Sequence, residues 1–192
     1  MSIFTRTWQR LTKESPYAAP AREAYLAVVA QARQPVFYAS FGVPDSIDGR
    51  FEMIALHAIL LVRRIKGRGT PSDQFGREFM TYLFADMDRN LREMGTGDMR
   101  VGKKIKEMAE AFYGRAKAYN AALDSGAPPL EDVLKRNIYA DVGDEHGAAR
   151  ELAETVQRQA DLLESQELVA ILAGTVHFEP PRGAASPNGQ ND

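Results

Sequence analysis

Apolar side chains recur along this chain at steps of three and four residues, which is the spacing of one face of an α-helix. One such stripe covers 72–94, and 51–65 is apolar on most sides, as expected of a helix at the centre of a bundle. No stretch alternates between apolar and polar residues as a strand does. The chain is therefore predicted to be all-α, a single-domain bundle of about six to eight helices. The clearest stripe consists of Val101, Ile105, Met108, Phe112, Ala116, Tyr119 and Leu123.

Proline, glycine and capping residues mark where the predicted helices begin and end. Pro35 ends an early helix, because a proline inside a helix removes one backbone hydrogen bond. Ser46 or Asp48 is a candidate N-cap for the central helix, and Asp98 is the candidate N-cap after a glycine-rich bend. Further helices are expected over 130–138, 144–164 and 165–173.

Composition divides the chain into three parts. Residues 1–14 form an expected N-terminal amphipathic segment, and residues 15–178 form the expected helical domain. Residues 179–192 are rich in proline, glycine, serine and asparagine without a hydrophobic period, so a disordered tail is predicted there. With 192 residues, of which 44% are hydrophobic, the chain is long enough to bury one substantial core.

Charge, cysteine content and hydropathy exclude several classes of protein. The net charge of −2 gives no overall attraction to nucleic acid, and no DNA partner is expected. The chain has no cysteine, which excludes disulfides and cysteine-ligated metal sites. The longest apolar run, 53–62, is far shorter than the ~20 residues that span a bilayer, and His57 within it is interpreted as a core histidine. No secretory signal is found at the N-terminus, so a cytoplasmic location is expected.

Motifs that resemble catalytic or cofactor sites lack what their chemistry requires. The segment 97–103 matches a phosphate-binding loop, but it follows a helix, and Lys104 stands where a magnesium-binding hydroxyl is needed. Asp86 and Asp88 resemble the aspartate cluster of magnesium-dependent prenyl-transferring enzymes, but no second acidic helix of that kind faces them. The histidines are too widely separated for a metal motif. We predict a protein that is not an enzyme and has no cofactor or metal, with a helical prenyl-transferring enzyme as an alternative.

The segment 37–45 is predicted to be an apolar loop with an exposed surface. A loop this rich in aromatic residues is a candidate surface for a protein partner. The alternative, that some of its aromatic rings fold into the core, stays open. The candidate contact residues are Phe37, Tyr38, Phe41, Pro44 and Asp45.

A second candidate surface lies on the polar side of the helix predicted over 72–94. Asp86, Arg89, Asn90 and Arg92 form the densest polar cluster of the chain and contain no catalytic set. They are predicted to bind a partner. The alternative is a semi-buried structural network in which Asp86 and Asn90 join Arg63 or Arg64.

Basic residues suggest contacts with a membrane. Phe4, Trp8 and Leu11 alternate with basic residues near the N-terminus, a pattern typical of a helix at a membrane interface, although packing on the bundle is the alternative. The basic patches at 63–68 and 100–106 are candidates for contact with lipid headgroups, RNA or acidic client residues, or else are solvated helix faces.

Four segments of the chain carry specific motifs. Residues 79–119 include D-M-D-R-N-L-R-E-M-G and V-G-K-K-I-K, and the other motifs are F-G-V-P-D-S from Phe41, F-E-M-I-A-L-H from Phe51 and L-V-R-R from Leu61. In these motifs the chain resembles the ubiquinol–cytochrome c chaperone family, with a similarity that covers about 17–139 and is most specific in 79–119.

This resemblance implies an all-helical assembly factor that binds newly synthesised cytochrome b during biogenesis of the ubiquinol–cytochrome c reductase complex. Family members work near the ribosome together with a small helper protein. No transit peptide is recognised, so the resemblance implies a bacterial member at the cytoplasmic face of the inner membrane. A ribosome- or RNA-binding helical adapter is the alternative function.

Overall fold

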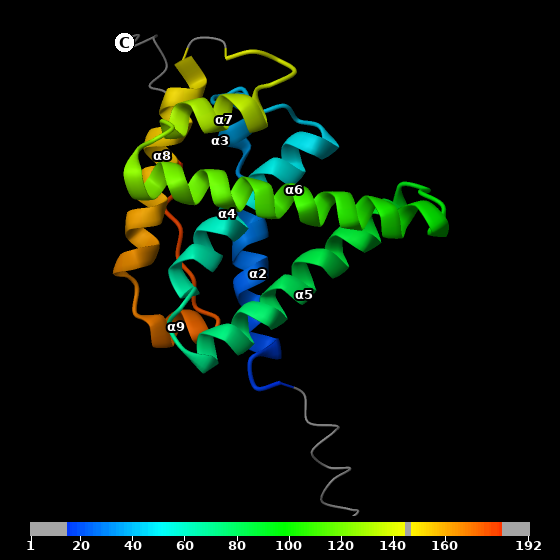
Figure 1. Cartoon of the computed structure of the whole chain (residues 1–192), viewed down its shortest axis with the longest axis vertical. Coiled ribbons are helices and arrows are strands. Elements are labelled where there is room, and N and C mark those ends of the chain that lie inside the picture. Colours follow the sequence, from blue (N-terminus) through cyan, green and yellow to red (C-terminus); the bar gives the residue numbers. More distant parts are fainter. Residues whose placement is uncertain (1–14, 145–146, 182–192) are drawn as a thin grey trace, which may run out of the picture.

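The computed structural model describes residues 15–144 and 147–181, which consist mainly of helices joined by loops (Figure 1). No strand occurs among these residues, which confirms the all-α prediction. Phe4, Trp8 and Leu11 lie outside the described residues, as does the predicted tail from 182 onward. The helices are α2 (Ala18–Ala32), α3 (Pro35–Ala39), α4 (Ile47–Ile65), α5 (Thr70–Glu93), α6 (Asp98–Ser125), α7 (Leu130–Ile138), α8 (Ala148–Ser165) and α9 (Leu168–Leu172).

Helix α4 lies at the centre of the bundle and packs against α2, α5, α6, α7 and α8. Ser46 is its N-cap, as predicted, and the Ser46 hydroxyl oxygen accepts a hydrogen bond of 3.1 Å from the Gly49 amide. Gly49 also permits a close approach, because a Cβ atom at this position would lie 2.0 Å from the carbonyl oxygen of Pro44. The start of α4 is thereby fixed against the segment that precedes it.

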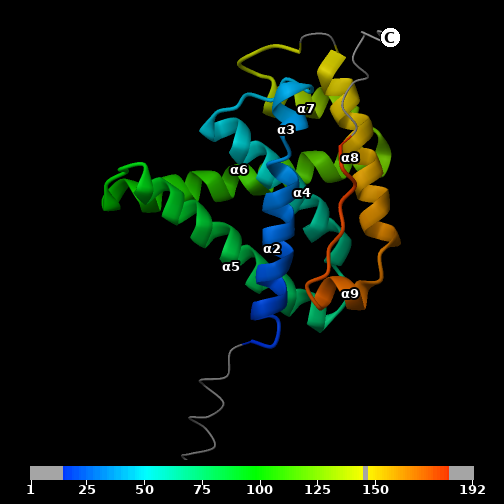
Figure 2. The same cartoon turned by 180° about the vertical axis from the view of Figure 1, so that it is seen from behind.

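Helices α5 and α6 form a long hairpin whose bend projects from the body of the molecule (Figure 1, Figure 2). Gly95 in the bend has a φ of 78°, which glycine adopts without strain. The N-cap of α6 is Gly97, so the predicted cap at Asp98 was one residue late. The two helices lie farther apart with distance from the bend. The far part of α5 packs on α2, whereas α6 crosses α4.

The segment predicted to be an exposed loop is partly helical and largely buried. Pro35 is the first residue of α3, a position whose backbone N–H would have no hydrogen-bond partner within the helix. The side chains of Phe37 and Phe41 are 0% and 1% exposed, and their rings meet edge to face with centroids 5.8 Å apart. Of the two alternatives left open for this segment, burial in the core is the one that holds for these two rings.

The end of the described chain, residues 173–181, is an extended strap that lies between α2 and α8 (Figure 2). Gln159 of α8 pairs with the main chain of Glu179, since it donates to the carbonyl oxygen at 2.6 Å and accepts from the amide at 3.0 Å. Gln166 pairs with the main chain of His177 in the same way, and Gln31 of α2 also donates to Glu179. The strap therefore joins the two helices through main-chain contacts.

Candidate functional site

A groove of about 930 Å³ lies between α4, α5 and α6, where the arms of the hairpin diverge. We call it the hairpin groove. Phe84 and Phe112 meet edge to face at its narrow end, with ring centroids 6.4 Å apart. Its apolar surface comes mainly from Ile59 and Val62 of α4, Met80 and Phe84 of α5, and Phe112, Tyr113 and Ala116 of α6.

Tyr113 stands at the edge of this groove and is 62% exposed, which is unusual for a large aromatic side chain. Its ring meets that of Phe112 edge to face at 5.7 Å, so one aromatic residue of the pair is buried and the other faces solvent. An exposed aromatic side chain beside an apolar groove is typical of a surface that binds a protein or an apolar ligand.

Two buried polar atoms belong to residues that line the hairpin groove. The hydroxyl oxygen of Ser72 and the side-chain carbonyl oxygen of Asn120 have no hydrogen-bond partner among the described residues. Leaving such a group unpaired costs on the order of 1–3 kcal/mol. Both oxygens are themselves buried, so they lie behind the surface of the groove and not in its open space.

None of the residues predicted to bind a partner in 37–45 or on the polar side of α5 lines the hairpin groove, whereas Arg63 and Lys66 of the predicted basic patch do. The stripe on α5 that faces the core includes Phe75, Phe79 and Leu83, which are fully buried. Met80 and Phe84 each follow one stripe residue and so form a second apolar line beside it. This second line, like Tyr113 after Phe112 on α6, was the signal in the sequence that could have indicated the groove.

The predicted polar cluster on α5 is tied to α2 through Asp86. The Tyr25 hydroxyl donates a hydrogen bond of 2.7 Å to the Asp86 carboxylate, and the Asn90 amide donates to the same oxygen at 3.1 Å. Burial, with a further contribution from Asp86, raises the pKa of Tyr25, so the phenol keeps the proton that it donates. Arg89 reaches Asp86 only at 3.9 Å. The structural network proposed as the alternative therefore exists, with Tyr25 in place of Arg63 or Arg64.

Arg92 forms an ion pair with Asp88 one turn earlier on α5, at 2.6 Å. The guanidinium holds the pKa of Asp88 below its ordinary value. Both side chains are exposed, so the pair contributes little to stability.

The structure brings the two predicted surfaces close to each other. Arg33 and Arg50 line a pocket of about 290 Å³ together with Asp86 and Asn90. The same two arginines also line a second hollow with Tyr38 and Asp45. Arg50 donates to Asp45 at 2.7 Å, and this hydrogen bond lowers the pKa of the carboxyl group. That these residues bind a partner stays a prediction.

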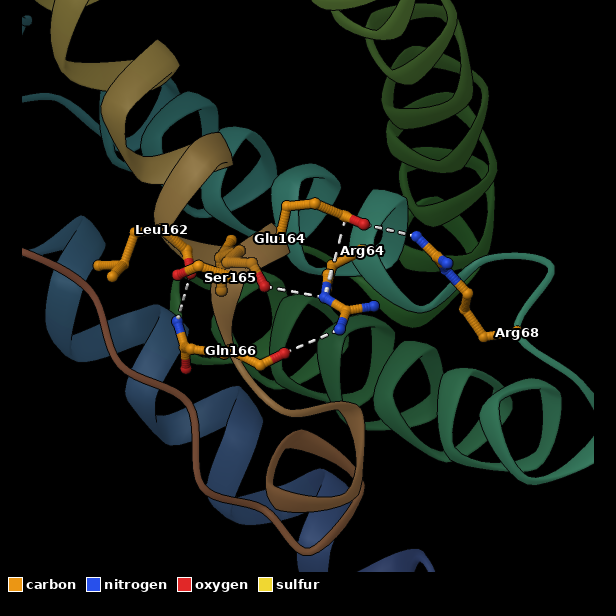
Figure 3. Close-up of polar contacts among 7 residues, drawn as sticks. Arg64, Arg68, Leu162, Glu164, Ser165 and Gln166 are labelled. Atoms are coloured by element: carbon orange, nitrogen blue, oxygen red, sulfur yellow. Dashed lines mark hydrogen bonds and ion pairs between the residues drawn. The ribbon is translucent and has the colours of Figure 1, made fainter.

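The basic patch at 63–68 is mostly occupied by contacts within the chain, which Figure 3 shows for two of its members. Arg64 of α4 donates to the carbonyl oxygens of Leu163 and Gln166, each at 2.8 Å, at the C-terminus of α8. Arg68 pairs with Glu164 at 2.5 Å, and Arg63 pairs with Asp124 at 2.6 Å. This patch therefore joins α4 to α6 and α8.

Glu52 of α4 and Arg115 of α6 form a buried ion pair with two hydrogen bonds. Burial raises the pKa of Glu52, while Arg115 acts in the opposite direction. Within residues 15–144 and 147–181, no group of three or more histidine, aspartate or glutamate side chains is placed to hold a metal ion. The Glu52–Arg115 ion pair is therefore a structural contact between α4 and α6.

A family model described as ubiquinol-cytochrome C chaperone matches residues 39–178. The chain belongs to this family. The matched range begins in α3 and includes all three helices of the hairpin groove.

Individual relatives agree with this assignment. The crystal structure of the Cbp3 homolog from Brucella abortus is 36% identical, with a TM-score of 0.77 over 92% of this chain and 97% of that chain. Ubiquinol-cytochrome-c reductase complex assembly factor 1 of Xenopus laevis is 24% identical over 75% of this chain and 72% of its own length. The Drosophila melanogaster and Mus musculus proteins of the same name are each 23% identical, and the chain spans 56% and 49% of their lengths.

The described helices of this family member differ in length and in apolar content. α6 is the longest, from Asp98 to Ser125, and it is strongly polar along its exposed side. Among the described residues no helix is both long and apolar enough to cross a bilayer.

Proposed function

We propose that this protein is a non-enzymatic assembly chaperone that holds newly made cytochrome b during biogenesis of the ubiquinol–cytochrome c reductase complex. Membership of the ubiquinol–cytochrome C chaperone family supports the choice of complex, as do relatives named for its assembly. The hairpin groove is the observation that supports holding rather than turnover. The chaperone works at the cytoplasmic face of the bacterial inner membrane, with the ribosome or a small helper protein as further partners.

The hairpin groove has the properties that a binding site for an apolar helical segment requires. Two diverging helices and α4 leave a space that a further helix fills by placing its apolar face inward. Met80 in the wall has an unbranched side chain that adapts to different surfaces.

The alternatives are less well supported by the described residues. A prenyl-transferring enzyme needs carboxylates that converge on magnesium, whereas Asp86 is bound by Tyr25 and Asp88 is paired with Arg92. An RNA-binding adapter needs available cations, and most of the patch at 63–68 is occupied. The patch at 100–106 is available, but no aromatic residue for base stacking lies near it in 89–107.

Substitution of Tyr113 tests this function. Tyr113→Asp places a charge beside the apolar groove, and we expect recovery of cytochrome b with the tagged full-length protein to fall at least about tenfold, as for a hot-spot residue. The matched control is Val169→Asp on α9, which changes another exposed apolar residue outside the groove. Quantitative mass spectrometry of the membrane proteins that co-purify gives the measurement.

Equal recovery of cytochrome b with Tyr113→Asp and the unchanged protein would show that the groove does not hold the client. Loss in both variants would show a general effect of surface charge. Recovery of ribosomes in place of cytochrome b, with loss at raised salt, would favour the RNA-binding adapter.

A further inference from the structure

The bend of the α5–α6 hairpin and helix α8 lie at opposite ends of the molecule and differ in charge (Figure 1, Figure 2). Residues 89–107, which surround the bend, contain six basic and three acidic residues. Residues 144–167, which lead into and through α8, contain seven acidic and two basic residues. The chain as a whole has a net charge of only −2, so its charge is separated along the molecule.

Four of the six basic side chains near the bend are available for a partner. Arg100 and Lys104 are exposed and make no ion pair with any described residue. Lys103 and Lys106 are also exposed, and each reaches only the glutamate one turn later, at 3.7 and 3.8 Å. Exposed ion pairs of this length are weak. This differs from the patch at 63–68, whose arginines are bound within the chain.

Three of these cations surround a hollow of about 370 Å³ at the bend itself. Arg100, Lys103 and Lys104 line it together with Met94, Gly95, Thr96 and one acidic residue, Glu107. Met94 is 46% exposed, so a flexible apolar side chain lies at the end of the projecting hairpin, next to the cations. Cations that bind phosphate beside an apolar side chain that enters the acyl region are typical of a surface for anionic lipid.

We propose that the hairpin tip, residues 94–107, is a docking surface for the headgroups of anionic phospholipids. The acidic α8 then lies away from the negatively charged membrane, which avoids electrostatic repulsion. The lipid is a better match than RNA, because no aromatic residue for base stacking occurs within 89–107. The proposal does not depend on the client, since binding to a membrane requires no cytochrome b.

The expected strength follows from the number of available cations. Each lysine or arginine near an anionic surface raises partitioning on the order of fivefold. The attraction weakens as salt is added, because exposed charges are screened.

Flotation of the full-length protein with vesicles tests the proposal. The probes are vesicles of phosphatidylcholine with and without phosphatidylglycerol. The tip variant carries Arg100→Glu, Lys103→Glu and Lys104→Glu, and the matched control carries Arg22→Glu, Lys117→Glu and Arg136→Glu, which gives the same net charge from exposed sites elsewhere. We expect binding to phosphatidylglycerol vesicles only, a loss of at least about tenfold in the tip variant, and retention in the control.

Further variants separate the contribution of the tip from that of the N-terminal segment and from loss of the fold. Met94→Asp is expected to weaken vesicle binding severalfold, and circular dichroism of each variant reports whether the fold is kept. Trp8→Glu tests the N-terminal segment, and its effect is expected to be smaller than that of the tip variant. Equal flotation of the tip variant and the unchanged protein would overturn the proposal, as would absence of flotation or equal binding to neutral vesicles. Tip-dependent binding to RNA without flotation would overturn it as well.

Discussion

Two buried ionisable side chains of α4 are satisfied in different ways. Glu52 accepts hydrogen bonds from Arg115, so its charge is paired. Nδ1 of His57 donates to the carbonyl oxygen of Met53 at 2.8 Å, and aromatic rings surround the imidazole on two sides. Burial lowers the pKa of His57 to about 4, because the apolar surroundings disfavour a charged imidazole more than the Met53 hydrogen bond favours it. His57 is therefore the neutral core histidine that its place in an apolar helix predicted.

At the scale of single residues, the buried His57 leads to a prediction of how stability depends on pH. The unfolded chain takes up a proton near the ordinary pKa of 6.5, whereas the folded protein resists protonation until about pH 4. Acid therefore favours the unfolded state between these values. We expect the free energy of unfolding to fall by about 2 kcal/mol more between pH 7 and pH 5 than in the His57→Leu variant, measured by urea denaturation. Parallel pH profiles for the two proteins would contradict this.

At the scale of elements, contacts between helix ends hold the bundle together. Arg64 of α4 binds two carbonyl oxygens at the C-terminus of α8, where carbonyl groups have no partners within the helix (Figure 3). The strap forms hydrogen bonds with Gln159 and Gln166 on another side of α8. Helix α8 is therefore attached by main-chain contacts at two places.

Replacement of Arg64 tests how much the end of α8 depends on this contact. Arg64→Ala removes the buried guanidinium that donates to the Leu163 and Gln166 carbonyl oxygens and leaves Leu163 only a 3.3 Å bond from the Gln166 amide, so we expect a loss of about 2–4 kcal/mol in the free energy of unfolding. Arg68→Ala is the control, since it removes an exposed ion pair to the same helix and is expected to cost less than about 1 kcal/mol. Chemical denaturation gives both values, and similar losses in the two variants would refute the special role of Arg64.

The sequence predicted the positions of the helices well, but it predicted the contacts between helices less well. The stripe from Val101 to Leu123 and the cap at Ser46 depend on neighbours within a few residues, so α6 and α4 were correctly predicted. The partners of Arg64 lie 99 and 102 residues away, and no local pattern specifies them. The burial of Phe37 likewise depends on packing against His57 in another element. The hairpin groove was missed for the same reason, because its walls come from three helices.

The whole molecule presents two separate surfaces. The hairpin groove lies where the arms diverge, and the hairpin tip lies where they meet. The groove is mainly apolar, with Arg63, Lys66, Asp73 and Arg77 also in its lining, whereas the tip is basic. A protein with this arrangement can approach a membrane with the tip while the groove stays open to a client beside it.

The two surfaces are therefore expected to act independently. Tyr113→Asp should reduce recovery of cytochrome b at least about tenfold and leave vesicle flotation unchanged. The tip variant should lose flotation, yet keep binding of a detergent-solubilised client. Flotation and co-purification of both variants in parallel provide the comparison. Loss of both activities in either variant would show that the surfaces are coupled or that the fold is damaged.

The strap has a consequence for anyone who shortens this protein. The family model matches residues 39–178, yet Gln159 is hydrogen-bonded to Glu179, one position beyond that range. A cut at the limits of similarity would also remove α2, and with it the phenol that binds Asp86. A fragment that folds by itself is therefore expected to need residues beyond the range of the family model at both ends, and low stability of a shorter fragment would reflect lost support for α8 and α5.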